Sequence, residues 1–214
     1  MADEFLYSQS EALVVLVLLA LLFACAEAGY RLGLRRRLRI DEPAKSRLDS
    51  VQSEILVLLG ILLGFTVAMS VSRYDGRKHA VVSEANAIGT AALRARLLPA
   101  PERGEAVTLL RQYVDIRLQS AQQRLDPAAL DELERKASQL HEKLWLLAAA
   151  VNSKEPQNFT TGLFITALNE LIDAKGLRDA ALDNHVPASV LVLLFAAAIV
   201  AVGMIGYSNG LAHH

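Results

Sequence analysis

Residues 55–98 decide the fold, and they read ILVLLGILLGFTVAMSVSRYDGRKHAVVSEANAIGTAALRARLL. An apolar run over 55–72 is followed by a charged cluster and then by small residues, and no proline interrupts the stretch. A helix of about 45 residues is about 65 Å long, roughly twice the thickness of the hydrocarbon core of a bilayer. The stretch therefore predicts one uninterrupted helix that crosses a membrane and continues well beyond it.

Two further apolar runs flank this helix in the sequence, at residues 12–26 and 187–207. With the residues at its edges, the first run reaches the roughly 20 residues that a bilayer core requires, and the second is long enough by itself. Asn184 and Pro187 are typical of a helix start before the last run. The sequence thus predicts an all-α membrane protein with about three transmembrane helices and a helical-bundle extramembrane domain between spans two and three.

The predicted organisation has six parts. They are the N-terminus with transmembrane helix 1 (1–30), a basic loop (31–53), transmembrane helix 2 (54–73), a helical extramembrane domain (74–185), transmembrane helix 3 (186–207) and a tail (208–214). A cleavable signal peptide is the rival interpretation of the first run, but such a peptide carries positive charge before its apolar core. Here the sequence starts MADEF, and the basic residues follow the core. The single Cys25 excludes an internal disulfide framework and a cysteine-based zinc site.

The basic residues after the first apolar run set the predicted orientation. Seven Lys and Arg residues lie within positions 31–47, and none lies within positions 1–10. Because short basic loops stay in the cytoplasm, we expect a multi-pass protein of the inner or plasma membrane, with its N-terminus outside, loop 31–53 in the cytoplasm and domain 74–185 outside. Four arginines are also candidates for contact with anionic headgroups, at about 1 kcal/mol each, although setting the topology is the simpler explanation: Arg35, Arg36, Arg37 and Arg39.

The region between spans two and three shows helical periodicity throughout. A heptad seam of about three heptads predicts left-handed packing against another helix, of the same chain or of a second subunit. The seam consists of Leu130, Leu133, Ala137, Leu140, Leu144, Leu147 and Val151. Two more apolar helix faces are predicted, one of Leu110, Tyr113, Val114, Leu118, Ala121 and Leu125, the other of Phe159, Leu163, Phe164, Ala167, Leu168, Leu171 and Ile172.

Small residues in the long helix, and the polar side chains among them, are the candidate functional positions. Small residues allow helices to approach closely, and Gly60-x-x-x-Gly64 allows this within the apolar run, so both glycines are candidate helix-packing residues. The candidate pore-lining residues are Ser83, Glu84, Asn86 and Thr90. Three interpretations stay open for Glu84 and Asn86: pairing with neighbours in a close-packed bundle, a water-filled axis, or plain exposure to solvent.

Residues 62–99 and 167–194 contain the most distinctive segments of the sequence. The first includes S-R-Y-D (72–75) and E-A-N-A-I-G-T (84–90), and the second reads ALNELIDAKGLRDAALDNHVPASVLVLL. Together with the basic loop, these segments resemble the bacterial bestrophin-like integral membrane proteins, a family mostly of unassigned function, and the resemblance covers most of the chain. Members of that family usually continue into a fourth apolar span with a charged tail, which this sequence does not contain.

The resemblance implies an ion channel or pore, by remote analogy with true bestrophins, which are pentameric channels. Three helices per chain cannot enclose a polar path, so a channel requires a homo-oligomer. No aromatic or aliphatic motif of the bestrophin pore constriction can be placed on this sequence, and likeness of fold does not by itself transfer function. The alternative is a non-conducting membrane scaffold or sensor whose helical domain binds a partner.

Other function classes find no support in the sequence. HExxH, CxxC, GxSxG and phosphate-loop motifs are absent, and the five histidines are scattered, so we expect no enzyme activity, no cofactor and no metal site. The net charge of −1 offers no basic field for nucleic acid. The expected partners are therefore the lipid bilayer, further copies of the chain, and ions.

Overall fold

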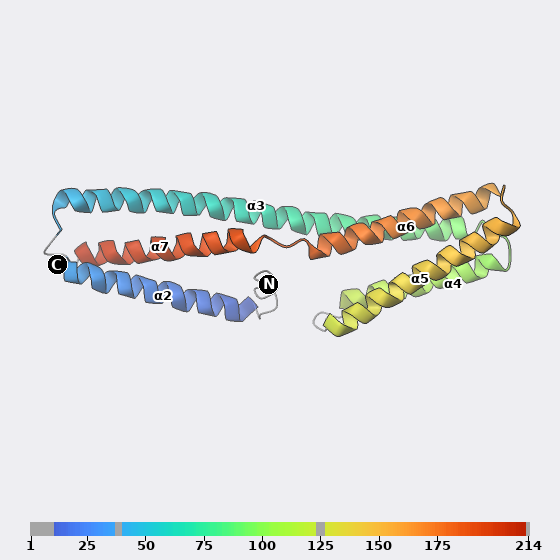
Figure 1. Ribbon diagram of the computed structural model, residues 1–214, viewed down its shortest axis with the longest axis horizontal. Coiled ribbons are helices and arrows are strands. Elements are labelled where there is room, and N and C mark those ends of the chain that lie inside the picture. The colour runs from blue at the N-terminus through green and yellow to red at the C-terminus, as the bar shows by residue number, and fades with distance from the viewer. Residues whose placement is uncertain (1–10, 37–39, 123–126, 213–214) are drawn as a thin grey trace. The chain divides into compact units, whose positions relative to one another are not determined.

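The computed structural model describes residues 11–36, 40–122 and 127–212 of the chain. These ranges contain helices and no strand, so the predicted all-α class is confirmed. The helices (Figure 1) are α2 (Glu11–Arg36), α3 (Glu42–Ala95), α4 (Glu102–Gln122), α5 (Pro127–Lys154), α6 (Phe159–Asp183) and α7 (Ala188–Ala212).

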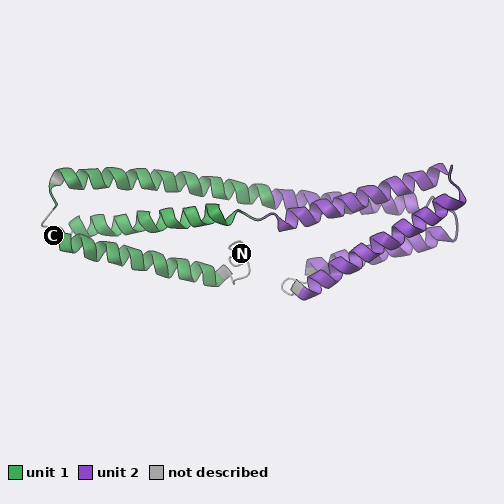
Figure 2. Cartoon of the chain, in the orientation of Figure 1, with its two compact units in different colours: residues 1–73, 185–214 green, residues 74–184 purple. Residues whose placement is uncertain are grey.

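The chain divides into two compact units (Figure 2). Unit 1 consists of Met1–Arg73 and His185–His214, and unit 2 consists of Tyr74–Asn184. Unit 1 contains α2, α7 and the first part of α3, whereas unit 2 contains the rest of α3 together with α4, α5 and α6.

Three helical stretches are long and apolar enough to cross a membrane. They lie within Ala12–Arg36, Pro43–Ala95 and Phe159–Ala212. They include the three runs that the sequence analysis identified as spans. The prediction of three membrane-spanning helices is therefore confirmed by length and composition.

Helix α3 is the uninterrupted helix that the sequence predicts, and it begins before the predicted start at residue 54. It extends over 54 residues from Glu42 to Ala95. Asp41 precedes it, and its carboxylate accepts a hydrogen bond from the backbone N–H of Ala44 at 3.3 Å, as a helix-capping residue does. Pro43 fits the first turn because the backbone N–H that proline lacks has no intrahelical partner there.

In unit 1, α2 and α7 lie side by side with their backbones in contact at glycines (Figure 1). A Cβ atom at Gly206 would lie 2.1 Å from the carbonyl oxygen of Ala26, and one at Gly33 would lie 2.3 Å from that of Tyr207. Small residues permit such an approach between membrane helices. By contrast, a Cβ atom at Gly60 or Gly64 would have no neighbouring atom within 4 Å, so these two glycines pack against no other helix within the part of the chain described.

In unit 2, α4 packs against α5 and α5 against α6, around a core that also takes in the C-terminal part of α3. Six of the seven seam residues of α5 are buried, and Leu130 is half-buried. The core that surrounds the seam includes Tyr113 of α4 and Phe164 of α6. The seam is therefore filled by helices of the same chain, which answers the question that the sequence left open.

The predicted apolar face of α4 is only half correct. Leu110 and Tyr113 are buried as expected, but Leu118 is 57% exposed and Arg117 is buried in the corresponding turn. Ala121 is exposed, and Leu125 lies outside the described residues. The reason is electrostatic: the interior of unit 2 at this level holds ion pairs, so a cation on α4 faces inward and the neighbouring leucine faces outward.

The predicted face of α6 is correct apart from its first residue. Phe159 is exposed, and the other six residues are buried or half-buried. Asn158 caps this helix, because its side-chain oxygen accepts hydrogen bonds from the backbone N–H groups of Thr160 and Thr161. Such a cap satisfies N–H groups that would otherwise lack a partner at the helix start.

Candidate functional site

The Glu84 carboxylate lies inside unit 2, where three side chains donate hydrogen bonds to it. Glu84 is 3% exposed. Its Oε1 atom accepts from the Tyr113 hydroxyl at 2.5 Å and from Nε of Arg117 at 2.7 Å, and its Oε2 atom accepts from Nη1 of Arg178 at 2.9 Å. A carboxylate with both oxygens satisfied in this way is held ionised in the interior.

Arg117 connects Glu84 to a second set of ion pairs. Its Nη1 atom donates to Glu134 at 2.5 Å, and its Nη2 atom lies 3.7 Å from Oδ1 of Asp179. Lys175 completes the set, with its Nζ atom 3.1 Å from Glu134 and 2.5 Å from Asp179. Glu134 and Asp179 form the outer edge, at 37% and 34% side-chain exposure.

These residues form one ion-pair cluster in which charge is balanced. Three carboxylates face three cations, and the members come from every helix of unit 2. The cluster, as the term is used below, consists of Glu84 (α3), Tyr113 and Arg117 (α4), Glu134 and His141 (α5), and Lys175, Arg178 and Asp179 (α6). Removal of one partner from a buried ion pair leaves an uncompensated charge, so loss of a single member is expected to destabilise unit 2.

His141 joins the cluster through Tyr113. The two rings are stacked with their centroids 4.6 Å apart, and the guanidinium of Arg117 lies 5.3 Å from the centre of the Tyr113 ring. His141 is 7% exposed, and its Nε2 atom has no hydrogen-bond partner among the described residues. The imidazole is thus a buried titratable group without a compensating acceptor at that atom.

The environment of the cluster fixes the protonation states of its members. Burial, and then the hydrogen bond to Glu84, raise the pKa of Tyr113, so the phenol stays protonated. Burial alone would raise the pKa of Glu134, but Arg117 and Lys175 outweigh it and hold this pKa below its ordinary value. Burial, followed by Lys175 and Arg117, lowers the pKa of His141 to about 4, so the imidazole is neutral at pH 7.

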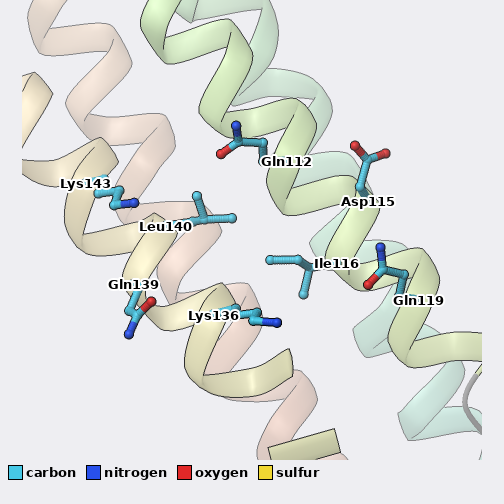
Figure 3. Close-up of a pocket in the computed structure, with 8 residues that line it drawn as sticks. All are labelled: Gln112, Asp115, Ile116, Gln119, Lys136, Gln139, Leu140 and Lys143. Atoms are coloured by element: carbon cyan, nitrogen blue, oxygen red, sulfur yellow. The ribbon is translucent and has the colours of Figure 1, made fainter. Parts of the chain in front are cut away.

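Grooves between α4 and α5 are separate from this cluster. One of about 370 Å³ is shown in Figure 3. Amide, ammonium and carboxylate groups line it around two aliphatic side chains: Gln112, Asp115, Ile116, Gln119, Lys136, Gln139, Leu140 and Lys143. A second groove of about 410 Å³ shares Lys143 and includes Glu102, Glu105 and Leu146. Neither is lined by the ion-pair cluster, and the described residues contain no group of His, Cys, Asp and Glu side chains arranged to bind a metal ion.

The structure separates the four candidate pore-lining residues. Ser83 and Asn86 are exposed and Thr90 is half-buried, whereas Glu84 lies in the interior. Positions 83, 86 and 90 follow each other at three and four residues and therefore share one helix face, which Glu84 does not join. For Glu84 the packed arrangement, with its charge satisfied by neighbours, is the one the structure shows; a role for the other three in lining a pore stays a prediction.

Among the candidate headgroup-facing residues, two can be placed. Arg35 and Arg36 are exposed in the last turn of α2. Arg37 and Arg39 lie outside the described residues. Contact of these arginines with lipid headgroups stays a prediction.

Sequence reasoning found Glu84 but missed the residues that surround it. Arg117 lies one turn after Tyr113, a spacing that places both on one helix face, yet the apolar pattern assigned that face to Leu118. Three further members lie at a similar spacing on α6: Lys175, Arg178 and Asp179. They were not predicted because the buried face of this helix was assigned from its apolar residues alone. The available signal was a set of charges at core-facing positions of two helices.

The chain matches a known protein family over most of its length. A sequence model described as the bestrophin-like domain matches residues 19–213, which is nearly the whole chain. No curated protein and no solved structure matches.

Proposed function

The chain belongs to the bestrophin-like family, and from this premise we propose that it is a homo-oligomeric membrane protein in which copies of α3 surround a shared axis that ions follow. The proposal assigns no chemical reaction to the protein, and it requires no cofactor. It concerns only the assembly of several chains and the passage of ions through the membrane.

One observation carries the proposal: α3 has a surface for close helix approach that the described chain does not use. Gly60 and Gly64 have no neighbouring atom within 4 Å, although they lie in the apolar run of the helix. Helices in lipid associate through small residues because lipid offers no hydrophobic driving force between them. A second α3 is the natural occupant of that surface, since a polar path needs several chains.

The exposed face at residues 83, 86 and 90 gives the proposed axis its polar groups. Ser83 and Asn86 are exposed, and Thr90 adds a half-buried hydroxyl on the same face. Hydroxyl and amide groups bind ions weakly, which suits a path through which ions must also leave. Glu84 is excluded from this role because its carboxylate is used by the ion-pair cluster.

Cysteine cross-linking tests the proposed assembly. In a Cys25→Ser background, we expect Asn86→Cys to give oligomer bands with a short thiol cross-linker in native membranes. Asn169→Cys is the matched control, because it also replaces an exposed asparagine of unit 2 but lies on α6. Equal yields at the two positions, or no bands at position 86, would contradict an axis lined by α3.

Planar-bilayer recording tests conduction separately. We expect the purified oligomer to conduct, and a thiol reagent to reduce the current of Asn86→Cys while leaving Asn169→Cys unaffected. Silence under several ion gradients, with the oligomer intact by cross-linking, rules out the channel and leaves assembly standing.

A scaffold or sensor is the second candidate function, and the grooves between α4 and α5 favour it. The seam of α5, which the sequence offered as a partner surface, is filled within the chain. The grooves remain free among the described residues and carry amide and ammonium groups suited to a protein partner. An intact but silent oligomer is the result that favours this function.

The proposed orientation places the N-terminus and unit 2 outside and the basic segment 31–53, which includes the end of α2 and the start of α3, in the cytoplasm, as the positive-inside rule favours. Labelling with a membrane-impermeant maleimide tests it in the Cys25→Ser background. In intact cells, we expect Asn169→Cys to react and Arg47→Cys to react only after lysis. The reverse pattern would invert the proposed topology.

A further inference from the structure

His141 has an unusual place within the ion-pair cluster. Its ring lies in the interior, and its Nε2 atom has no hydrogen-bond partner among the described residues. Its ring instead stacks on Tyr113, whose hydroxyl is committed to Glu84. The neutral imidazole therefore fits as a flat, nearly apolar group, and an imidazolium would not.

Burial first, and then the charges that face His141, make a second proton on its ring unfavourable. Arg117 of α4 and Lys175 of α6 repel it, while Glu84 of α3 and Asp179 of α6 attract it. Both oxygens of Glu84 are already occupied, and Asp179 is paired with Lys175. On α5, the helix that carries His141, the Glu134 carboxylate is paired with Arg117 and Lys175 of the neighbouring helices. One added positive charge therefore enters a cluster whose three carboxylates already balance three cations.

We propose that the ion-pair cluster is a proton-operated switch of unit 2, in which uptake of a proton by His141 weakens the packing of α5 against α3, α4 and α6. The packed carboxylates of Glu84 and Glu134, whose pKa values their partners hold below the ordinary value despite burial, stay ionised while this happens. The switch does not depend on conduction, because it concerns the stability of the bundle alone.

The sign and the pH window follow from the two protonation states. His141 has an ordinary pKa of 6.5, which applies when α5 is detached, and a pKa of about 4 in the packed bundle. The detached state therefore binds the proton first, so stability is full above about pH 6.5 and falls as the pH is lowered toward 4. A difference of roughly 2.5 between the pKa values corresponds to a change of up to about 300-fold in the opening equilibrium. Because Arg117 and Lys175 hold the pKa of Glu134 low, this carboxylate loses its charge only in stronger acid.

Hydrogen exchange on the full chain in detergent micelles or nanodiscs tests the switch. We expect the opening equilibrium of α5, corrected for intrinsic exchange rates, to rise by about 80-fold between pH 6.5 and 4 in the wild type, because His141 is half-protonated in the detached state at pH 6.5 and in the packed state at pH 4. In His141→Phe, which keeps an aromatic ring beside Tyr113 and cannot bind a proton at that position, we expect a rise of less than about tenfold, since carboxylates freed by opening also bind protons near their ordinary pKa of 4.5. The single tryptophan, Trp145, lies one turn from His141 on α5 and gives an independent fluorescence readout.

His79→Phe is the matched control, because His79 is an exposed histidine of α3 in unit 2 and should leave the wild-type profile unchanged. A His141→Phe profile as steep as the wild type would overturn the proposal, since the carboxylates would then be responsible. A second measurement covers the case in which His141→Phe does not fold. The imidazole proton resonances of wild-type His141 should titrate near pH 4, and titration at pH 6 or above would also overturn the proposal.

Discussion

Arg117→Met is expected to lower the free energy of unfolding of unit 2 by about 3–5 kcal/mol, the usual cost of removing one partner from a buried ion pair. Methionine keeps most of the volume of the arginine stem, so the loss is electrostatic rather than steric. The substitution removes the cation nearest to Glu84 and Glu134 and leaves three carboxylates facing two cations. Arg178 and the Tyr113 hydroxyl still reach Glu84, which places an upper limit on the loss.

Arg111→Met provides the matched control on the same helix. Arg111 is exposed on α4, so its replacement should change the free energy of unfolding by no more than about 0.5 kcal/mol. The measurement is unfolding of the full chain in detergent, followed by the fluorescence of Trp145 and by hydrogen exchange in unit 2. Similar losses for the two variants would show that Arg117 is no more than a surface cation.

The pair Glu84→Gln and Arg117→Met extends this test to the function of Glu84. Because the two side chains are in contact, the double variant should be less unstable than the sum of the single variants, by about 0.5–3 kcal/mol. Glu84→Gln should also leave the ion selectivity of a conducting oligomer unchanged, since the carboxylate faces the cluster. A change of ion selectivity in Glu84→Gln, without a loss in the free energy of unfolding, would show that the Glu84 side chain lines the proposed axis.

Periodicity predicted the parts of the fold that depend on apolar burial. The seam of α5 is a clear case. Apolar residues spaced alternately by three and four lie on one face of a helix, and that face must be buried to keep them out of water. The continuity of α3 beyond the apolar run was predictable because no proline interrupts residues 55–98, whereas its start at Glu42 was not, since residues 42–53 were predicted to belong to the basic loop. The number of spans followed from the length of three apolar runs.

The ion-pair cluster was not predictable by the same reasoning. An apolar pattern treats each charge as a surface residue, and Arg117 and Leu118 are neighbours, so the pattern chose the leucine. Which of the two faces inward depends on Glu84, which lies 33 residues earlier on another helix. Pairing at that distance in sequence is a property of the tertiary structure and leaves no periodic signal.

The contact between α2 and α7 was predictable from the sequence only in part. Gly29 and Gly33, and likewise Gly206 and Gly210, show the small-x-x-x-small spacing, and so do Gly60 and Gly64. The spacing indicates that a helix is able to approach another closely, but not which helix fills the space. The structure assigns two of the three motifs to the contact between α2 and α7 and leaves the third without a neighbour in the described chain.

Gly206→Ala is therefore expected to disrupt unit 1, whereas Gly60→Ala is not. The new Cβ atom at position 206 would lie 2.1 Å from the carbonyl oxygen of Ala26, more than 1 Å inside an ordinary contact, and a backbone atom cannot rotate away. The two helices must separate, and overpacking of this kind costs about 1–3 kcal/mol or more. At Gly60 no atom lies within 4 Å, and alanine favours the helix by up to about 1 kcal/mol.

The reactivity of Cys25 measures this separation directly. Cys25 lies on α2 within the contact, because its carbonyl oxygen is 3.9 Å from the Cβ position of Gly203. In detergent, Gly206→Ala should react faster with a small maleimide and unfold at a lower temperature, while in Gly60→Ala the reactivity of Cys25 should match that of the wild type. Gly60→Ala should weaken cross-linking between chains and leave Cys25 protected, because the proposed assembly gives the two glycine motifs separate roles. Equal effects of both substitutions on Cys25 would contradict this division, because packing within the chain and packing between chains would then not be separable.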